Sequence, residues 1–199
     1  EHHSESPEAY FAHTPGLRVL TPADAAEAYV TIQQAIASDD PVIYFEPKRR
    51  YWDRAEVDEV SPISGNPWSS RVLRRGSDVT LVGYGPMVRT ILEAADAAAE
   101  DGVECSVIDL RSLSPLDLDP VVADVQSTGR CVVVHEAPVM LGMGAEVAAE
   151  VTRRCFFHLE APVERVGGAY IPYPPNRFEQ HYLPDVDRVL DAIDRVTAV

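Results

Sequence analysis

The sequence predicts an α/β protein whose strands form a mostly parallel sheet with helices on both faces. Short unbroken apolar runs, typical of strands buried on both faces, alternate with segments in which apolar residues recur at helical spacing. A charged stretch rich in proline and glycine interrupts this alternation and divides the chain. We therefore expect the end of one domain in residues 1–47, a linker in 48–76 and a complete second domain in 77–199.

The first domain shows one strand, one helix and one strand. The run LRVL (17–20) predicts a strand that stops at Thr21. Pro22 suits a first helical turn, and the helix is expected to end near SDDP (38–41), because the residue before a proline disfavours the α conformation. The second strand, VIYF (42–45), completes a parallel βαβ unit. Since about 45 residues cannot cover both faces of such a sheet, we expect the upstream part of this domain to be missing.

The second domain repeats the pattern several times. VTLVGYG (79–85) predicts a strand that enters a glycine turn, and the last helix is amphipathic from Val186 to Val196. Between them the sequence predicts strands at 103–110, 131–138 and 162–168, and helices from about Val88 to Gly102, at 118–129 and at 144–155.

Composition and charge exclude several classes of protein. Of the 199 residues, 32 are acidic and 17 are basic, and the formal net charge of −15 repels nucleic acids and anionic membrane surfaces. We find neither an apolar run of about 18 residues nor a signal peptide, and we expect a cytoplasmic protein. The three cysteines lie far apart and form no CxxC pair, so we interpret them as buried structural thiols.

Two glycine motifs follow predicted strands without being specific for a ligand. GYGPMV (83–88) lacks the third glycine of a dinucleotide-binding fingerprint and favours a tight turn. GMGAE (142–146) is typical of close helix packing, with weak support for an anion at the helix N-terminus.

Several histidines are candidates for acid–base chemistry. His135 and Glu136, at the end of a predicted strand, form an acid–base pair, or Glu136 only bonds donors of the linker or a neighbouring subunit. His158 and His181 are expected at the surface. The opening segment HHSESPEAYFAH is expected to be an irregular loop, where a histidine transfers protons near neutral pH or belongs to a surface remnant.

An ordered series of motifs resembles the β subunit of the thiamin diphosphate-dependent E1 component of 2-oxo acid dehydrogenase complexes. The series is HHSESPEAYFAHTPGLRVLTP, DDPVIYFEPKRRYW, SDVTLVGYG, CSVIDLRSLSPLD, TGRCVVVHEAP and PYPPNRFEQHYLPD. The resemblance implies the last βαβ part of a thiamin-diphosphate pyrimidine-binding domain, followed by a transketolase C-terminal-like domain. FEPK and HEAP are more similar to branched-chain 2-oxo acid dehydrogenase than to pyruvate dehydrogenase, and pyruvate and acetoin dehydrogenases remain alternatives.

The resemblance also implies a reaction and a role for His3. The family decarboxylates a 2-oxo acid and reductively acylates a lipoyl group of the E2 component, and His3 matches the histidine of the family's HSxSPEA motif, which protonates or binds that lipoyl group. His2 matches a variable position, while Ser4 and His13 are expected to support the loop. The family's activating glutamate lies upstream of residue 1, and its α subunit holds the diphosphate and Mg²⁺. We therefore predict that this chain alone neither binds thiamin diphosphate tightly nor decarboxylates a substrate.

The remaining implications concern assembly and a structural ion. Expected partners are the E1 α subunit, a second β subunit, and the subunit-binding and lipoyl domains of the E2 acyltransferase. A noncatalytic role in subunit assembly and E2 docking is the alternative from another functional class. In some relatives a turn holds a structural K⁺ ion, and the matching positions are Ala35, Ser38 and Asp40, whose oxygens suit a hard cation.

Overall fold

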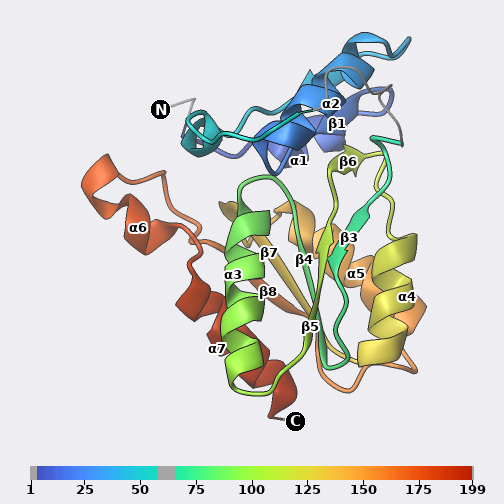
Figure 1. Ribbon diagram of the computed structural model, residues 1–199, viewed down its shortest axis with the longest axis vertical. Helices are drawn as coiled ribbons and strands as arrows, with labels where there is room; N and C mark the ends of the chain where they lie inside the picture. The colour runs from blue at the N-terminus through green and yellow to red at the C-terminus, as the bar shows by residue number, and fades with distance from the viewer. Residues whose placement is uncertain (1–3, 58–65, 199) are drawn as a thin grey trace.

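The computed structural model describes residues 4–57 and 66–198, which form two sheets (Figure 1). The smaller sheet lies above the carboxyl edge of the larger one in the view of Figure 1. The larger sheet consists of four strands of the second predicted domain and one strand, Arg71–Arg74, of the predicted linker. The fold confirms the expected α/β class with a mostly parallel main sheet.

The smaller sheet has three strands in the order β2-β1-β6. Strands β1 (Arg18–Leu20) and β2 (Val42–Tyr44) pair in parallel and are joined by helix α2 (Ala25–Ile36), which confirms the predicted βαβ unit. The third strand, β6 (Ser112–Ser114), comes from the second domain and pairs antiparallel with β1. The two predicted domains therefore share a sheet.

The larger sheet has five strands in the order β3-β5-β4-β7-β8. Strands β5, β4, β7 and β8 are parallel to one another. At one edge of the sheet β3 pairs antiparallel with β5. The strands are β3 (Arg71–Arg74), β4 (Val79–Gly83), β5 (Cys105–Asp109), β7 (Cys131–Pro138) and β8 (Glu164–Gly168).

Helices cover both faces of the larger sheet, as the sequence predicts (Figure 1). Helices α3 (Met87–Glu100) and α7 (Val186–Thr197) pack on one face, and α4 (Asp119–Thr128) and α5 (Met143–Cys155) pack on the other. Alternate residues of one strand supply the two cores: Leu81 belongs to the first and Val82 to the second. Cys105, Cys131 and Cys155 are free and buried, which confirms their structural interpretation.

The structure contains elements that periodicity did not predict. Helix α1 (Glu8–Ala12) follows Pro7 where an irregular loop was expected, because one turn of helix is too short to show a periodic pattern. Strand β3 lies within residues 48–76. The short helices are the 3₁₀ segments Lys48–Arg50 and Asn176–Phe178 and helix α6 (Glu179–Tyr182). Among residues 4–57 and 66–198, no helix has the length and apolar character of a membrane span.

Candidate functional site

The candidate site lies where the order of the larger sheet reverses. From β4 the chain passes first to β5 on one side and later to β7 on the other, so a crevice opens at the carboxyl ends of β4 and β7. Ligands of open α/β sheets bind at such switch points. Tyr84 directly follows β4, and β7 contains His135 and Glu136. This crevice is therefore the candidate site for ligand binding.

The segment 4–8 and the linker close this crevice into a cleft of about 560 Å³. Three motifs of the sequence meet there: SESPE (4–8), FEPKR (45–49) and the Glu136 of HEAP. The full lining is Ser4, Glu5, Ser6, Pro7, Glu8, Thr21, Phe45, Glu46, Pro47, Lys48, Arg49, Pro86, Glu136, Tyr173, Glu179 and Leu183. Tyr173 and Glu179 come from a fourth motif, PYPPNRFEQHYLPD, and the Tyr173 hydroxyl donates a hydrogen bond to the Glu179 carboxylate.

Glu136 pairs with the linker instead of with its neighbour His135. A nitrogen of the Arg49 guanidinium lies 2.8 Å from Glu136 Oε1. Burial raises the pKa of Glu136, and Arg49 opposes this rise. His135 is fully buried, whereas Glu136 faces the cleft, because successive residues of a strand point to opposite faces. The interpretation of Glu136 as the partner of a linker donor is therefore confirmed.

His135 serves the packing of helix α5 against the sheet. Its Nδ1 lies 2.9 Å from the carbonyl oxygen of Ala137, and a side chain at Gly144 would place its Cβ only 2.6 Å from His135 Nε2. Burial lowers the pKa of His135 to about 4, so the ring is neutral at pH 7. The glycines of GMGAE allow close helix packing, as their spacing predicted.

Glu8 brings into the cleft a carboxyl group that titrates near neutral pH. Burial raises the pKa of Glu8 to about 7, with a smaller contribution in the same direction from the charge of Glu136. Its Oε2 atom is enclosed and has no hydrogen-bond partner among the described residues, and the same is true of the Tyr84 hydroxyl. Burial raises the pKa of Tyr84 well above its usual value, and Glu8 and Glu136 add to this effect. Of these two buried polar groups, Glu8 lines the cleft and can exchange hydrogen bonds there with a ligand or water.

The charge of the cleft does not suit a diphosphate. Five glutamates, Glu5, Glu8, Glu46, Glu136 and Glu179, face two cations, Lys48 and Arg49. Carboxylates repel phosphate groups, and the part of the chain that the structure describes has no cluster of three His, Cys, Asp or Glu side chains arranged for a metal ion. The described residues therefore do not fit the diphosphate and Mg²⁺ of thiamin diphosphate.

The turn predicted to bind K⁺ joins α2 to β2. The Ser38 amide donates to the Ala35 carbonyl oxygen at 3.2 Å, and the Asp40 carboxylate pairs with Arg18 at 2.6 Å. The Arg18 guanidinium also lies 4.3 Å from the ring centroid of Trp68. Since Asp40 already pairs with a cation through its side chain, only main-chain oxygens of this turn fit K⁺, and the site remains a prediction.

The structure describes only some of the histidines that the sequence analysis considered. His2 and His3 lie outside the described residues. Ser4, the next residue in the sequence, lines the cleft. His13 is exposed after the end of α1, and His158 and His181 are exposed as predicted. In the GYGPMV turn, Gly85 has φ +53° and lies against Thr21, which supports a tight turn.

Two family descriptions match this architecture. Residues 69–189 match "Transketolase, C-terminal domain", and residues 1–52 match "Transketolase, pyrimidine binding domain". The chain belongs to the transketolase family. A solved structure described as "Split gene transketolase, inactive beta4 tetramer" superposes with a TM-score of 0.74 at 26% identity, over 96% of this chain and 60% of that one.

Curated relatives of this transketolase-family chain are subunits of 2-oxo acid dehydrogenases. The pyruvate dehydrogenase E1 component subunit beta of Leifsonia xyli is 52% identical over all of this chain and 58% of its own length. The 3-methyl-2-oxobutanoate dehydrogenase subunit beta of Mycobacterium tuberculosis is 50% identical over 98% of this chain and 56% of its own length. The mitochondrial 2-oxoisovalerate dehydrogenase subunit beta of Dictyostelium discoideum is 45% identical, over 92% and 50%. The chain spans about half the length of these relatives.

Proposed function

We propose that the chain is part of the β subunit of a branched-chain 2-oxo acid dehydrogenase E1 component. The observation that carries this proposal is the meeting of SESPE, FEPKR and Glu136 around one cleft. These motifs lie far apart in the sequence and are the ones on which the family resemblance depends. The Mycobacterium and Dictyostelium relatives, named for branched-chain substrates, support the choice of substrate. The Leifsonia relative supports pyruvate as the alternative.

In the proposed enzyme, thiamin diphosphate supplies the electron sink for decarboxylation when it is bound in the assembled E1 component. The described residues of this chain contribute the wall of the cleft. Glu8 gains and loses a proton near neutral pH, Arg49 pairs with Glu136, and Ser4 follows His3 in the sequence. We propose that His3 moves a proton at the lipoyl group that receives the acyl group.

The proposed assembly includes an E1 α subunit, a second β subunit and the E2 domains that carry and bind the lipoyl group. The α subunit would hold the diphosphate and Mg²⁺, in keeping with the acidic character of the cleft. A structural K⁺ would bind main-chain oxygens of Ala35, Ser38 and Asp40. This chain alone is then expected to give no saturable micromolar heat of binding with thiamin diphosphate and Mg²⁺ in calorimetry.

An assembly role without catalysis is the second candidate function. Phe156 and Phe157, at the end of α5, stack edge to face and are 65% and 94% exposed, which favours a contact with another protein. The solved relative named an inactive tetramer supports the same idea.

Replacement of His3 by alanine in the full-length subunit separates the two functions. With the α partner, thiamin diphosphate, Mg²⁺ and lipoylated E2 domain, we expect His3→Ala to slow lipoyl acylation by at least the factor of about 100 typical of a lost acid–base group. His13→Ala is the matched control, because His13 is exposed away from the cleft. Wild-type acylation by His3→Ala in a correctly assembled complex would remove His3 from the reaction and favour the assembly role.

A further inference from the structure

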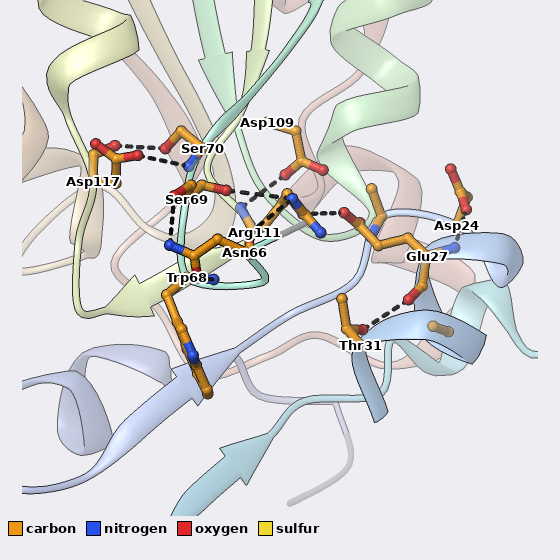
Figure 2. Close-up of polar contacts among 12 residues, drawn as sticks. Asp24, Glu27, Thr31, Asn66, Trp68, Ser69, Ser70, Asp109, Arg111 and Asp117 are labelled. Atoms are coloured by element: carbon orange, nitrogen blue, oxygen red, sulfur yellow. Dashed lines mark hydrogen bonds and ion pairs between the residues drawn. The ribbon is translucent and has the colours of Figure 1, made fainter. Parts of the chain in front are cut away.

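Two buried acidic residues and a partly buried arginine meet between the smaller and the larger sheet (Figure 2). Glu27 lies in the first turn of α2, Asp109 ends β5, and Arg111 follows two residues later. The side chains of Glu27 and Arg111 are 3% and 16% exposed, and Asp109 is 1% exposed. We call these three residues the junction cluster.

Glu27 has the contacts of an ionised carboxylate. Its Oε1 lies 2.5 Å from Arg111 Nε, and its Oε2 accepts a hydrogen bond from the Ala23 amide at 2.7 Å. The Glu27 amide donates to the N-cap residue Asp24 at 2.7 Å, which fixes the start of α2. Glu27 Oε2 therefore accepts a backbone hydrogen bond, while Oε1 forms an ion pair with Arg111, which carries the only full positive charge of the cluster.

Asp109 lacks the ion pair that Glu27 has. Its Oδ1 accepts a hydrogen bond from the Arg111 amide at 3.0 Å, its side chain is buried, and the guanidinium of the cluster pairs with Glu27 instead. A buried carboxyl group that has no cationic partner and lies beside a carboxylate retains its proton, because ionisation would bury a second, unpaired negative charge. Burial, and then the charge of Glu27, raise the pKa of Asp109 well above its usual value. The charged groups that face it are Glu27 from α2 and Arg111 from the segment after β5.

Arg111 joins the two sheets through both its backbone and its side chain. Its φ of +58° lies in the left-handed region, which residues other than glycine rarely adopt. In this conformation its carbonyl oxygen accepts a hydrogen bond from Thr21 at 2.9 Å, while its guanidinium reaches Glu27 and the carbonyl oxygen of Asn66. Thr21 in turn lines the cleft.

We propose that Glu27, Asp109 and Arg111 form a latch between the two sheets that holds one proton, on Asp109, and that this latch positions the wall of the cleft. The cluster is then electrically neutral, with one guanidinium, one carboxylate and one carboxylic acid. The positioning of the cleft rests on the proposed function, whereas the latch and its proton do not. The two buried carboxyl groups should consequently respond differently to replacement by an amide.

Amide substitutions in this chain test the asymmetry directly. Asp109→Asn replaces a neutral acid by a neutral group of the same shape, so we expect the urea midpoint of unfolding to stay close to that of the wild type. Glu27→Gln leaves the Arg111 charge buried without its counter-ion, so we expect a large fall of the midpoint or loss of the folded state. The double variant Glu27→Gln with Arg111→Met should recover part of this loss, since both charges are then gone. Exposed Arg89→Met is the control and should have no effect.

Infrared spectroscopy at neutral pH tests the proton itself, and it does not depend on enzyme activity. A Glu8→Gln background removes the carboxyl group of the cleft whose pKa rises to about 7. We expect a protonated-carboxyl band that disappears on Asp109→Asn. The pH dependence should agree: because the folded protein retains a proton that the unfolded chain loses, this group makes the folding equilibrium constant fall about tenfold per pH unit above about pH 4, until the folded-state pKa is reached. Asp109→Asn should remove that slope.

Two results would overturn the latch. One is a spectrum without a protonated-carboxyl band that depends on Asp109. The other is equal damage from Asp109→Asn and Glu27→Gln. If the latch is present but Asp109→Leu in the assembled full-length enzyme leaves the ratio of lipoyl acylation to decarboxylation and its pH profile unchanged, the positioning of the cleft is wrong. Absence of any dehydrogenase activity in the wild type would instead contradict the proposed function and leave the latch intact.

Discussion

Helices α2 and α3 have similar lengths but bury opposite kinds of surface. Helix α3 buries seven residues against the larger sheet, and all except Thr90 are apolar. Helix α2 buries only Glu27 and Thr31, and its Ile36 side chain is 79% exposed. Helix α3 is therefore stabilised mainly by apolar burial, whereas α2 buries polar groups that contact the second domain. The apolar burial of the smaller sheet comes from Val19 and Leu20 of β1.

The largest difference should appear when apolar residues of the two sheets are truncated. Leu81 of β4 is fully buried in the core of the larger sheet. We therefore expect Leu81→Ala to lower the free energy of unfolding by about 2–5 kcal/mol. Ile43 in β2 is only half-buried, and Ile43→Ala should cost clearly less. Urea unfolding followed by circular dichroism gives both values. Equal losses would show that the smaller sheet is stabilised by an apolar core after all.

A smaller effect should appear as pH dependence from the cleft. Because the pKa of Glu8 rises to about 7 in the folded state from 4.5, the folded protein binds a proton that the unfolded chain has released. Its contribution to stability is complete below the unfolded pKa and falls as pH rises through about 7. Unfolding measured between about pH 5 and 8 should therefore show a shallower decline for Glu8→Gln than for the wild type. The same slope in both proteins would mean that Glu8 is ionised in the cleft.

The smallest effect is expected for the ion pair at the mouth of the cleft. Arg49 is partly exposed, so Arg49→Met should change the free energy of unfolding by less than about 1 kcal/mol. The substitution should nevertheless raise the pKa of Glu136, since Arg49 opposes the effect of burial. An NMR titration of the Glu136 carboxyl carbon measures this rise. Lys48→Met removes the neighbouring cation of the same motif and should shift the pKa of Glu136 less. A larger shift for Lys48→Met than for Arg49→Met would assign the pairing to Lys48.

The strands and helices of the larger sheet could be predicted because their residues carry the signal themselves. Runs such as CVVVHEAP are apolar over their inner positions, and the helices show a clear apolar stripe. Strands β3 (RVLR) and β6 (SLS) could not be found this way, since their partners β5 and β1 define them. The single turn of α1 is likewise too short for periodicity.

The candidate site could be predicted only through the family resemblance. The motifs SESPE, FEPKR and HEAP were recognised in the sequence, but their meeting in one cleft follows from the fold. The junction cluster was missed because Glu27 and Asp109 are far apart in the chain. One local signal was available: Asp109 is the one acidic residue of the buried run CSVIDL, and an acidic group inside a buried strand implies a partner or a retained proton.

The most direct test of the account is carbon dioxide release by the full-length β subunit co-expressed with its α partner. With thiamin diphosphate and Mg²⁺, the account predicts faster release from 3-methyl-2-oxobutanoate than from pyruvate. Faster release from pyruvate would contradict the branched-chain assignment while keeping the reaction. No release from either substrate by a correctly assembled complex would contradict the proposed enzymatic function.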